Sequence, residues 1–139
     1  MSNVQQLPIG VFDSGVGGLS VLKVLQEQFP NEDFIYIGDN ANNPVGNRSD
    51  DEITYLACHI AEALEKQPVK LMVIACNTFT VVALDAVRER VSVPVIGVSQ
   101  GVKTAISQSK SKTIGIMATV ATVNSHIHKH VALEVDHEV

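Results

Sequence analysis

Short apolar runs alternate with segments of helical spacing along the whole chain, and this alternation constrains the fold more than any other feature. The apolar runs are rich in Val and Ile, as is typical of parallel strands covered on both faces. They span residues 7–12, 34–38, 71–75, 94–98 and 113–118. Helical spacing occupies residues 18–28, 53–64, 79–90 and 100–107. The order predicts an α/β fold: a doubly wound, flavodoxin-like, mainly parallel sheet with right-handed crossovers.

Composition excludes several classes of function. Ten Lys and Arg against fifteen Asp and Glu give a net charge of −5, and without a basic run we expect no nucleic-acid partner. The longest apolar runs, such as residues 71–76, fall far short of the roughly 20 residues that span a bilayer. The first residues lack the basic and apolar regions of an export signal, so we expect a cytoplasmic protein with no membrane partner.

Ligands of doubly wound sheets bind beyond the carboxyl ends of the strands, which directs attention to the loops 13–18, 39–48, 76–78, 99–101 and 119–122. Residues 13–18 read Asp-Ser-Gly-Val-Gly-Gly between a strand and a helix. The glycines can expose N–H groups to a carboxylate or phosphate, although the loop is neither a P-loop nor a full GxGxxG motif. The sequence of this loop is consistent with an anion site and with a plain tight turn. A carboxylate at a strand end has no evident structural role, so Asp13 favours a functional interpretation of the loop.

The two cysteines favour different interpretations. Cys76 ends the third run just before a helix, where oriented amides stabilise a thiolate, and Asn77 and Thr78 add donors beside the sulfur. We therefore expect Cys76 to act as a base or nucleophile rather than as a small buried side chain. Cys58 lies within a helical segment without clustered donors, and a structural role is expected.

The long polar loop from residue 40 to residue 48 contains the turn formers of a substrate-covering or merely connecting segment. Arg48 is expected to pair with the acidic start of the next helix. That start, Ser49 followed by Glu52 three residues later, has the spacing of a capping box.

Three histidines, His126, His128 and His130, alternate near the chain end. A strand would place them on one face, and a helix would stack the outer two at i, i+4. Because no Cys or firm carboxylate partner stands nearby, a solvated terminus is favoured over a metal site.

Together, these residues resemble the cofactor-independent aspartate/glutamate racemase family, and its glutamate-acting members most closely. The resemblance runs from Pro8 to about Ser125. Its carriers are PIGVFDSGVGGL at 8–19, GD at 38–39 with PVG at 44–46, VIACNT at 73–78 and VPVIGV at 93–98, with a weaker echo at 114–125.

The resemblance implies an isomerase that interconverts L- and D-glutamate for peptidoglycan synthesis without a cofactor or metal. The chemistry needs a base on one face of Cα and an acid on the other, for which the family uses two cysteines. Cys76 matches the first, and Asp13 would assist or orient it. Substrate contacts would come from Asp13, Ser14, Pro44, Val45, Gly46, Asn77, Thr78, Thr119 and Thr122.

Two departures qualify this implication. Val45 replaces a tyrosine that the family usually carries, and the family's second cysteine lies in a Gly-Cys-Thr-His segment absent from these 139 residues.

Family members have two similar lobes, so we expect a fold shortened relative to theirs: a first lobe at 1–98 carrying Asp13 and Cys76, and an incomplete second lobe at 99–139. Uncovered apolar faces would favour self-association, and activity would be impaired or absent. The alternatives are a non-catalytic module that binds amino acids or small anions, and a non-functional remnant.

Overall fold

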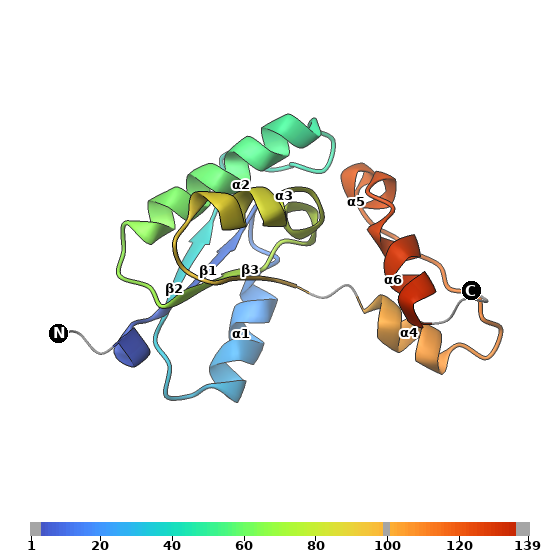
Figure 1. Ribbon diagram of the computed structural model, residues 1–139, viewed down its shortest axis with the longest axis horizontal. Coiled ribbons are helices and arrows are strands. Elements are labelled where there is room, and N and C mark those ends of the chain that lie inside the picture. The colour runs from blue at the N-terminus through green and yellow to red at the C-terminus, as the bar shows by residue number, and fades with distance from the viewer. Residues whose placement is uncertain (1–3, 99–100, 136–139) are drawn as a thin grey trace.

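The structure is a computed structural model that describes residues 4–98 and 101–135. It contains a parallel sheet flanked by helices, followed by a group of three helices (Figure 1). In the described parts of the chain, no helix combines the length and apolar character needed to cross a membrane.

The sheet confirms the predicted α/β class. Its strands are β1 (Ile9–Asp13), β2 (Phe34–Gly38), β3 (Leu71–Ile74) and β4 (Val95–Gly97), all parallel and in the order β2-β1-β3-β4. Every residue of β1 is buried, because this strand is paired on both edges and covered on both faces. Its Phe12 lies beside Ile37 of β2 and Ile74 of β3.

Helices cover the two faces of the sheet unequally (Figure 1). Helix α1 (Leu19–Gln28) packs Val21, Leu22 and Leu25 against one face. Helices α2 (Asp50–Glu65) and α3 (Asn77–Arg90) cover the other, and the larger core lies there around Phe12 and Phe79. A short 3-10 helix, Val4–Gln6, precedes β1.

The predicted capping box begins α2. The Ser49 side chain accepts a hydrogen bond from the Glu52 N–H at 3.3 Å, and the Glu52 carboxylate accepts one from the Ser49 N–H at 3.1 Å. Hydrogen bonds to the Glu52 carboxylate from the Ser49 N–H, the larger contribution, and from the Ser49 hydroxyl lower the pKa of that carboxyl.

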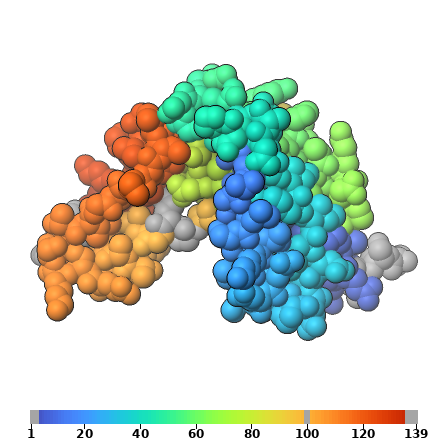
Figure 2. Space-filling model, turned by 180° about the vertical axis from the view of Figure 1, so that it is seen from behind, coloured from blue at the N-terminus to red at the C-terminus, as the bar shows by residue number. Residues whose placement is uncertain are grey.

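The last three helices are α4 (Val102–Gln108), α5 (Val120–Asn124) and α6 (Ile127–Val135). Helices α4 and α6 share a small apolar cluster of Val102, Ile106 and Ala132. Figure 2 shows this orange group meeting the rest of the molecule along its upper side, with a hollow below. The division into lobes at residues 98 and 99 stays a prediction. The predicted loop and helix residues Ser99 and Gln100 lie outside the described residues.

The predicted fifth strand, residues 113–118, is wrong. This segment forms no strand and has no ladder partner among the described residues. Ile116 and Met117 are exposed, Met117 fully. A β-strand is defined by the neighbour that accepts its hydrogen bonds, so apolar, β-branched composition alone does not make one.

Candidate active site

The carboxyl ends of β1 and β3 form the topological switch point of the sheet. From β1 the chain crosses to β2 on one side, and later returns to β3 on the other. Ligands of doubly wound sheets bind at such a point. Asp13 is the last residue of β1, and Cys76 follows β3 by two residues. The Ala75 N–H donates to the Phe12 carbonyl at 2.7 Å and ties the two strand ends together.

Asp13 organises the glycine-rich loop. Its side chain is 5% exposed, and its Oδ2 accepts hydrogen bonds from the Gly15 N–H at 3.1 Å and the Gly18 N–H at 2.9 Å. A Cβ on Gly18 would stand 2.7 Å from the Asp13 Cβ, so only glycine allows this approach. Two amides that could have met an anion therefore bind Asp13, which supports the tight-turn interpretation of the loop.

Cys76 lies at the N-cap of α3 with two hydrogen-bonding neighbours. Its Sγ accepts from the Phe79 N–H at 3.4 Å and is 3.2 Å from the Ser14 Oγ. The thiol is 6% exposed and also borders the larger apolar core. Oriented amides at a helix N-terminus favour a thiolate, and the contact between Ser14 and Cys76 can have either atom as its donor.

Tyr36 is a member of this group that the sequence did not reveal. Its hydroxyl donates to the Gly15 carbonyl at 3.1 Å. Burial raises the pKa of Tyr36 to about 12, with further contributions from the charge of Asp13, a hydrogen bond to Asp13 and the charge of Cys76. A phenol on β2 thus lies close to both site residues. The one sequence signal that could have identified Tyr36 as a site residue is its position two residues before the Gly38-Asp39 pair.

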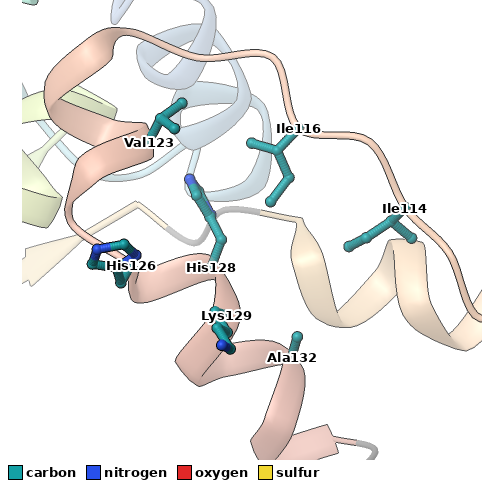
Figure 3. Close-up of a pocket in the computed structure, with 7 residues that line it drawn as sticks. All are labelled: Ile114, Ile116, Val123, His126, His128, Lys129 and Ala132. Atoms are coloured by element: carbon teal, nitrogen blue, oxygen red, sulfur yellow. The ribbon is translucent and has the colours of Figure 1, made fainter. Parts of the chain in front are cut away.

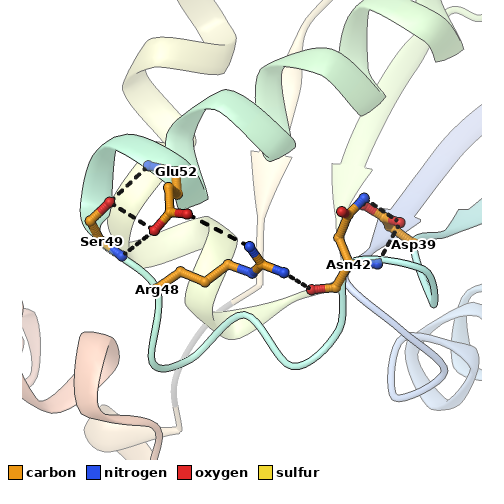
Figure 4. Close-up of polar contacts among 5 residues, drawn as sticks. All are labelled: Asp39, Asn42, Arg48, Ser49 and Glu52. Atoms are coloured by element: carbon orange, nitrogen blue, oxygen red, sulfur yellow. Dashed lines mark hydrogen bonds and ion pairs between the residues drawn. The ribbon is translucent and has the colours of Figure 1, made fainter.

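The polar loop is held by its own side chains (Figure 4). Asp39 accepts two hydrogen bonds from the Asn42 amide, and Arg48 donates to the Asn42 carbonyl at 2.9 Å. Arg48 also pairs with Glu52 at 3.7 Å, which confirms the pairing predicted with the acidic helix start.

The Pro44-Val45-Gly46 stretch has three different environments. Pro44 is exposed. Val45 is 3% exposed within the larger apolar core, so its side chain serves packing and only its backbone can face a ligand. The Gly46 carbonyl accepts from the Ala121 N–H at 3.3 Å, and a Cβ on Gly46 would stand 2.6 Å from the Thr119 side chain.

The start of α3 meets the start of α5 through side-chain hydrogen bonds. The Asn77 amide donates to the Thr122 Oγ1 at 3.2 Å, and the Thr78 and Thr119 hydroxyls are 3.0 Å apart. Thr119 is the N-cap of α5 and donates to the Thr122 Oγ1 at 3.1 Å. Beside them lies a cavity of about 380 Å³, lined by Asn77, Thr78, Ile116, Met117, Ala118, Thr119, Thr122 and His128.

The structure therefore gathers the predicted residues into two adjoining sets. Asp13, Ser14 and Cys76 form the first, at the strand ends. The second set is joined to the first through the peptide bond that follows Cys76, and it consists of Asn77, Thr78, Thr119 and Thr122 with the Gly46 backbone beside them.

Cys58 is buried on α2 as predicted, at 5% exposure, and burial raises the pKa of its thiol.

The expectation of a solvated histidine terminus is wrong for His128, which is 8% exposed on α6. The first turn of that helix directs His128 inward, whereas His126 and His130 stay exposed. In residues 4–98 and 101–135, no three His, Cys, Asp or Glu side chains are grouped as metal ligands.

Comparison with known proteins gives one consistent result. Residues 9–138 match the Asp/Glu/Hydantoin racemase family. Glutamate racemase from Picosynechococcus sp. is 45% identical over 99% of this chain and 49% of its own length, and that from Herpetosiphon aurantiacus is 50% identical over 84% and 46%. The chain thus spans about half the length of the curated relatives it matches.

Solved structures agree. Glutamate racemase RacE1 from Bacillus anthracis superposes with a TM-score of 0.86 at 40% identity, over 96% of this chain and 50% of that one. The Francisella tularensis glutamate racemase, solved in complex with D-glutamate, superposes with a TM-score of 0.79 at 40% identity, over 94% and 49%. With its parallel sheet, its strand-end Asp and Cys and these matches together, the chain belongs to the Asp/Glu/Hydantoin racemase family.

Proposed function

We propose that this chain carries one half of the acid/base machinery of a glutamate racemase, with Cys76 as the base that removes the Cα proton. The observation that carries the proposal is the position of the Cys76 Sγ. It lies at the N-terminus of α3, 3.2 Å from the Ser14 hydroxyl, at the switch point of the sheet. Membership of the family and the solved relative that holds D-glutamate support glutamate as the substrate.

The proposed step moves one proton. The Cys76 thiolate forms an S–H bond as the Cα–H bond breaks, and the electron pair delocalises into the adjacent α-carboxylate. Donors near that carboxylate stabilise the developing charge, because preorganised dipoles cost no reorganisation during the reaction. We assign this role to Asn77 and Thr78, whose side chains contact those of Thr122 and Thr119. The backbone of residues 44–46 would complete the substrate contacts.

Asp13 acts in this proposal through the loop that it holds. Its bonds to the Gly15 and Gly18 amides fix the turn from which Ser14 reaches the Cys76 Sγ. Asp13 thereby orients the thiol. The Tyr36 hydroxyl also holds the loop, by donating a hydrogen bond to the Gly15 carbonyl. We assign to the Asp13 carboxylate a second role in binding the ammonium group of the substrate.

In this proposal, the 139 residues supply a base for one face of the substrate Cα. The sequence holds two cysteines, and Cys58 is buried on α2 in the core. Inversion needs an acid on the face opposite the base. We therefore expect the chain to exchange the Cα proton of one glutamate enantiomer with solvent while it racemises little or none.

The test is proton NMR of L-glutamate and, separately, D-glutamate incubated with the purified chain in D₂O. Loss of the Cα–H signal from one enantiomer, without the appearance of the other, is the expected result. If neither enantiomer exchanges although both bind in calorimetry, a non-catalytic binding module replaces this proposal. Rapid conversion of one enantiomer to the other would refute the single-face account.

Self-association is part of the proposal, with a second copy of the chain as the partner. Ile96 on the edge strand β4 is 53% exposed, and Met117 is fully exposed. An edge strand and exposed apolar side chains both favour association between copies. Sedimentation equilibrium should show a dimer that Ile96→Lys weakens, and a monomer at all concentrations would contradict this.

A further inference from the structure

His128 is a buried polar side chain without a partner. It is 8% exposed, and neither Nδ1 nor Nε2 has a hydrogen-bond partner among the residues that the structure describes. Buried polar groups in native proteins are nearly always hydrogen-bonded, so each exception requires an explanation. A purely structural position would be better filled by an apolar side chain.

The surroundings of His128 indicate what it is for. Figure 3 shows the ring rising from α6 into the gap between Val123 and Ile116, away from Ala132. His128 also lines the cavity of about 380 Å³ that contains Asn77, Thr78, Thr119 and Thr122. That volume lies within the range of about 300–1,000 Å³ usual for small-molecule sites. Residues of the proposed active site therefore form one wall of the cavity, and His128 forms part of a different wall.

The charges of the side chains that line the cavity indicate which kind of ligand it would bind. The described residues that line this cavity are amides, hydroxyls and apolar side chains apart from His128. His128 is thus the one lining side chain that can carry a positive charge. A dicarboxylic amino acid has a net negative charge, and a hydrogen bond to a charged group is stronger than a neutral one.

We infer that His128 contacts the bound amino acid and that its imidazole donates a hydrogen bond to a carboxylate oxygen of that ligand. The inference rests on the proposed function and adds to it a binding residue from α6. It explains why a histidine occupies a buried position with no hydrogen-bond partner among the described residues.

The experiment measures glutamate binding by calorimetry to the wild-type chain and to three variants. His128→Leu removes both ring nitrogens while keeping an apolar volume, and His128→Asn keeps one donor. His130→Leu is the matched control, because His130 is exposed on the same helix and pairs with Glu134 at the surface. We expect His128→Leu to weaken binding about tenfold or more, His128→Asn to restore part of the loss, and His130→Leu to change little.

Thermal unfolding separates binding from folding. Because the ring nitrogens have no partner in the described chain, His128→Leu should unfold at a temperature equal to or above that of the wild type. Nitrogen-15 chemical shifts of the His128 ring should move when wild-type protein is saturated with glutamate. Repeating the titrations with glutamine identifies the carboxylate: dependence on His128 that persists points to the α-carboxylate, and dependence that vanishes points to the side-chain carboxylate.

Two failures are distinguishable. If the wild type binds glutamate and His128→Leu binds it equally well, with unmoved ring shifts, His128 has no contact with the ligand and this inference alone is overturned. If the wild type binds neither glutamate nor aspartate, the proposed function and the inference fall together.

Discussion

Titration of Tyr36 offers a direct test of the arrangement around Asp13. The chain has two tyrosines, so the variant Tyr55→Phe leaves Tyr36 as the sole source of tyrosinate absorbance. Burial, followed by the charge and hydrogen bond of Asp13 and the charge of Cys76, raises the Tyr36 pKa from 10.0 to about 12. We expect an absorbance midpoint near that value in the folded chain and near 10 in denaturant.

The same shift predicts the pH dependence of stability. A folded-state pKa above the unfolded value means that the folded chain keeps a proton which the unfolded chain releases. The stabilisation is therefore complete below pH 10 and is lost as the pH rises from about 10 to about 12. At about 1.4 kcal/mol per pKa unit, a shift of this size corresponds to at most about 3 kcal/mol, and partial exposure of the ring makes this an upper bound.

Asp13→Asn in the Tyr55→Phe background removes the charge that opposes ionisation of the phenol. The Tyr36 midpoint should fall toward 10 without reaching it, because the burial contribution remains. Circular dichroism at each pH checks that the midpoint precedes unfolding. A midpoint near 10 in the folded parent, or no response to the loss of the Asp13 charge, would show that the phenol, the carboxylate and the thiol are not neighbours.

Three further predictions concern packing, capping and thiol reactivity. Gly46→Ala should destabilise the chain by about 1–3 kcal/mol in urea unfolding, because a Cβ there would stand 2.6 Å from Thr119. Gly115→Ala, with open space around it, should stay within about 0.5 kcal/mol of the parent, and equal losses would contradict the close approach. Ser49→Ala should cost about 1 kcal/mol in thermal unfolding by removing the N-cap of α2, whereas an unchanged midpoint would mean that the capping box contributes nothing. In Cys76→Ala the remaining thiol, Cys58, should react with iodoacetamide at pH 8 about tenfold more slowly than free cysteine, because burial raises its pKa; reaction at the free rate would refute its burial.

The sheet and its helices follow from the sequence because their causes are local. Continuous Val and Ile runs identify strands buried on both faces, and the apolar stripe and capping box identify α2. The resemblance to the racemase family paired Asp13 with Cys76, and the topology of the sheet explains why the two meet. Parallel strands place their carboxyl ends on one edge, so two polar residues far apart in sequence are brought together by topology.

The structure differs from the sequence-based predictions where the conformation or role of a residue depends on partners far away in the sequence. Residues 113–118 have the composition of a strand but no strand beside them among the described residues. Val45 resembles a loop residue, yet it is buried in the core. The roles of Tyr36 and His128 are set by what surrounds them in space, namely Gly15 and Asp13 for the phenol and the cavity beside Thr119 for the imidazole. No local periodicity encodes such contacts.

The central claim is that the Cys76 thiolate is the base, and deuterium exchange in matched cysteine variants tests it most directly. The rate at which the Cα proton of the reactive glutamate enantiomer is replaced in D₂O is compared for the parent, Cys76→Ser and Cys58→Ser. We expect the exchange rate of Cys76→Ser to fall at least about 100-fold, as is typical when a positioned acid/base group is lost, while Cys58→Ser exchanges at the parental rate. Equal exchange by the parent and Cys76→Ser, with both folded, would show that another group removes the proton.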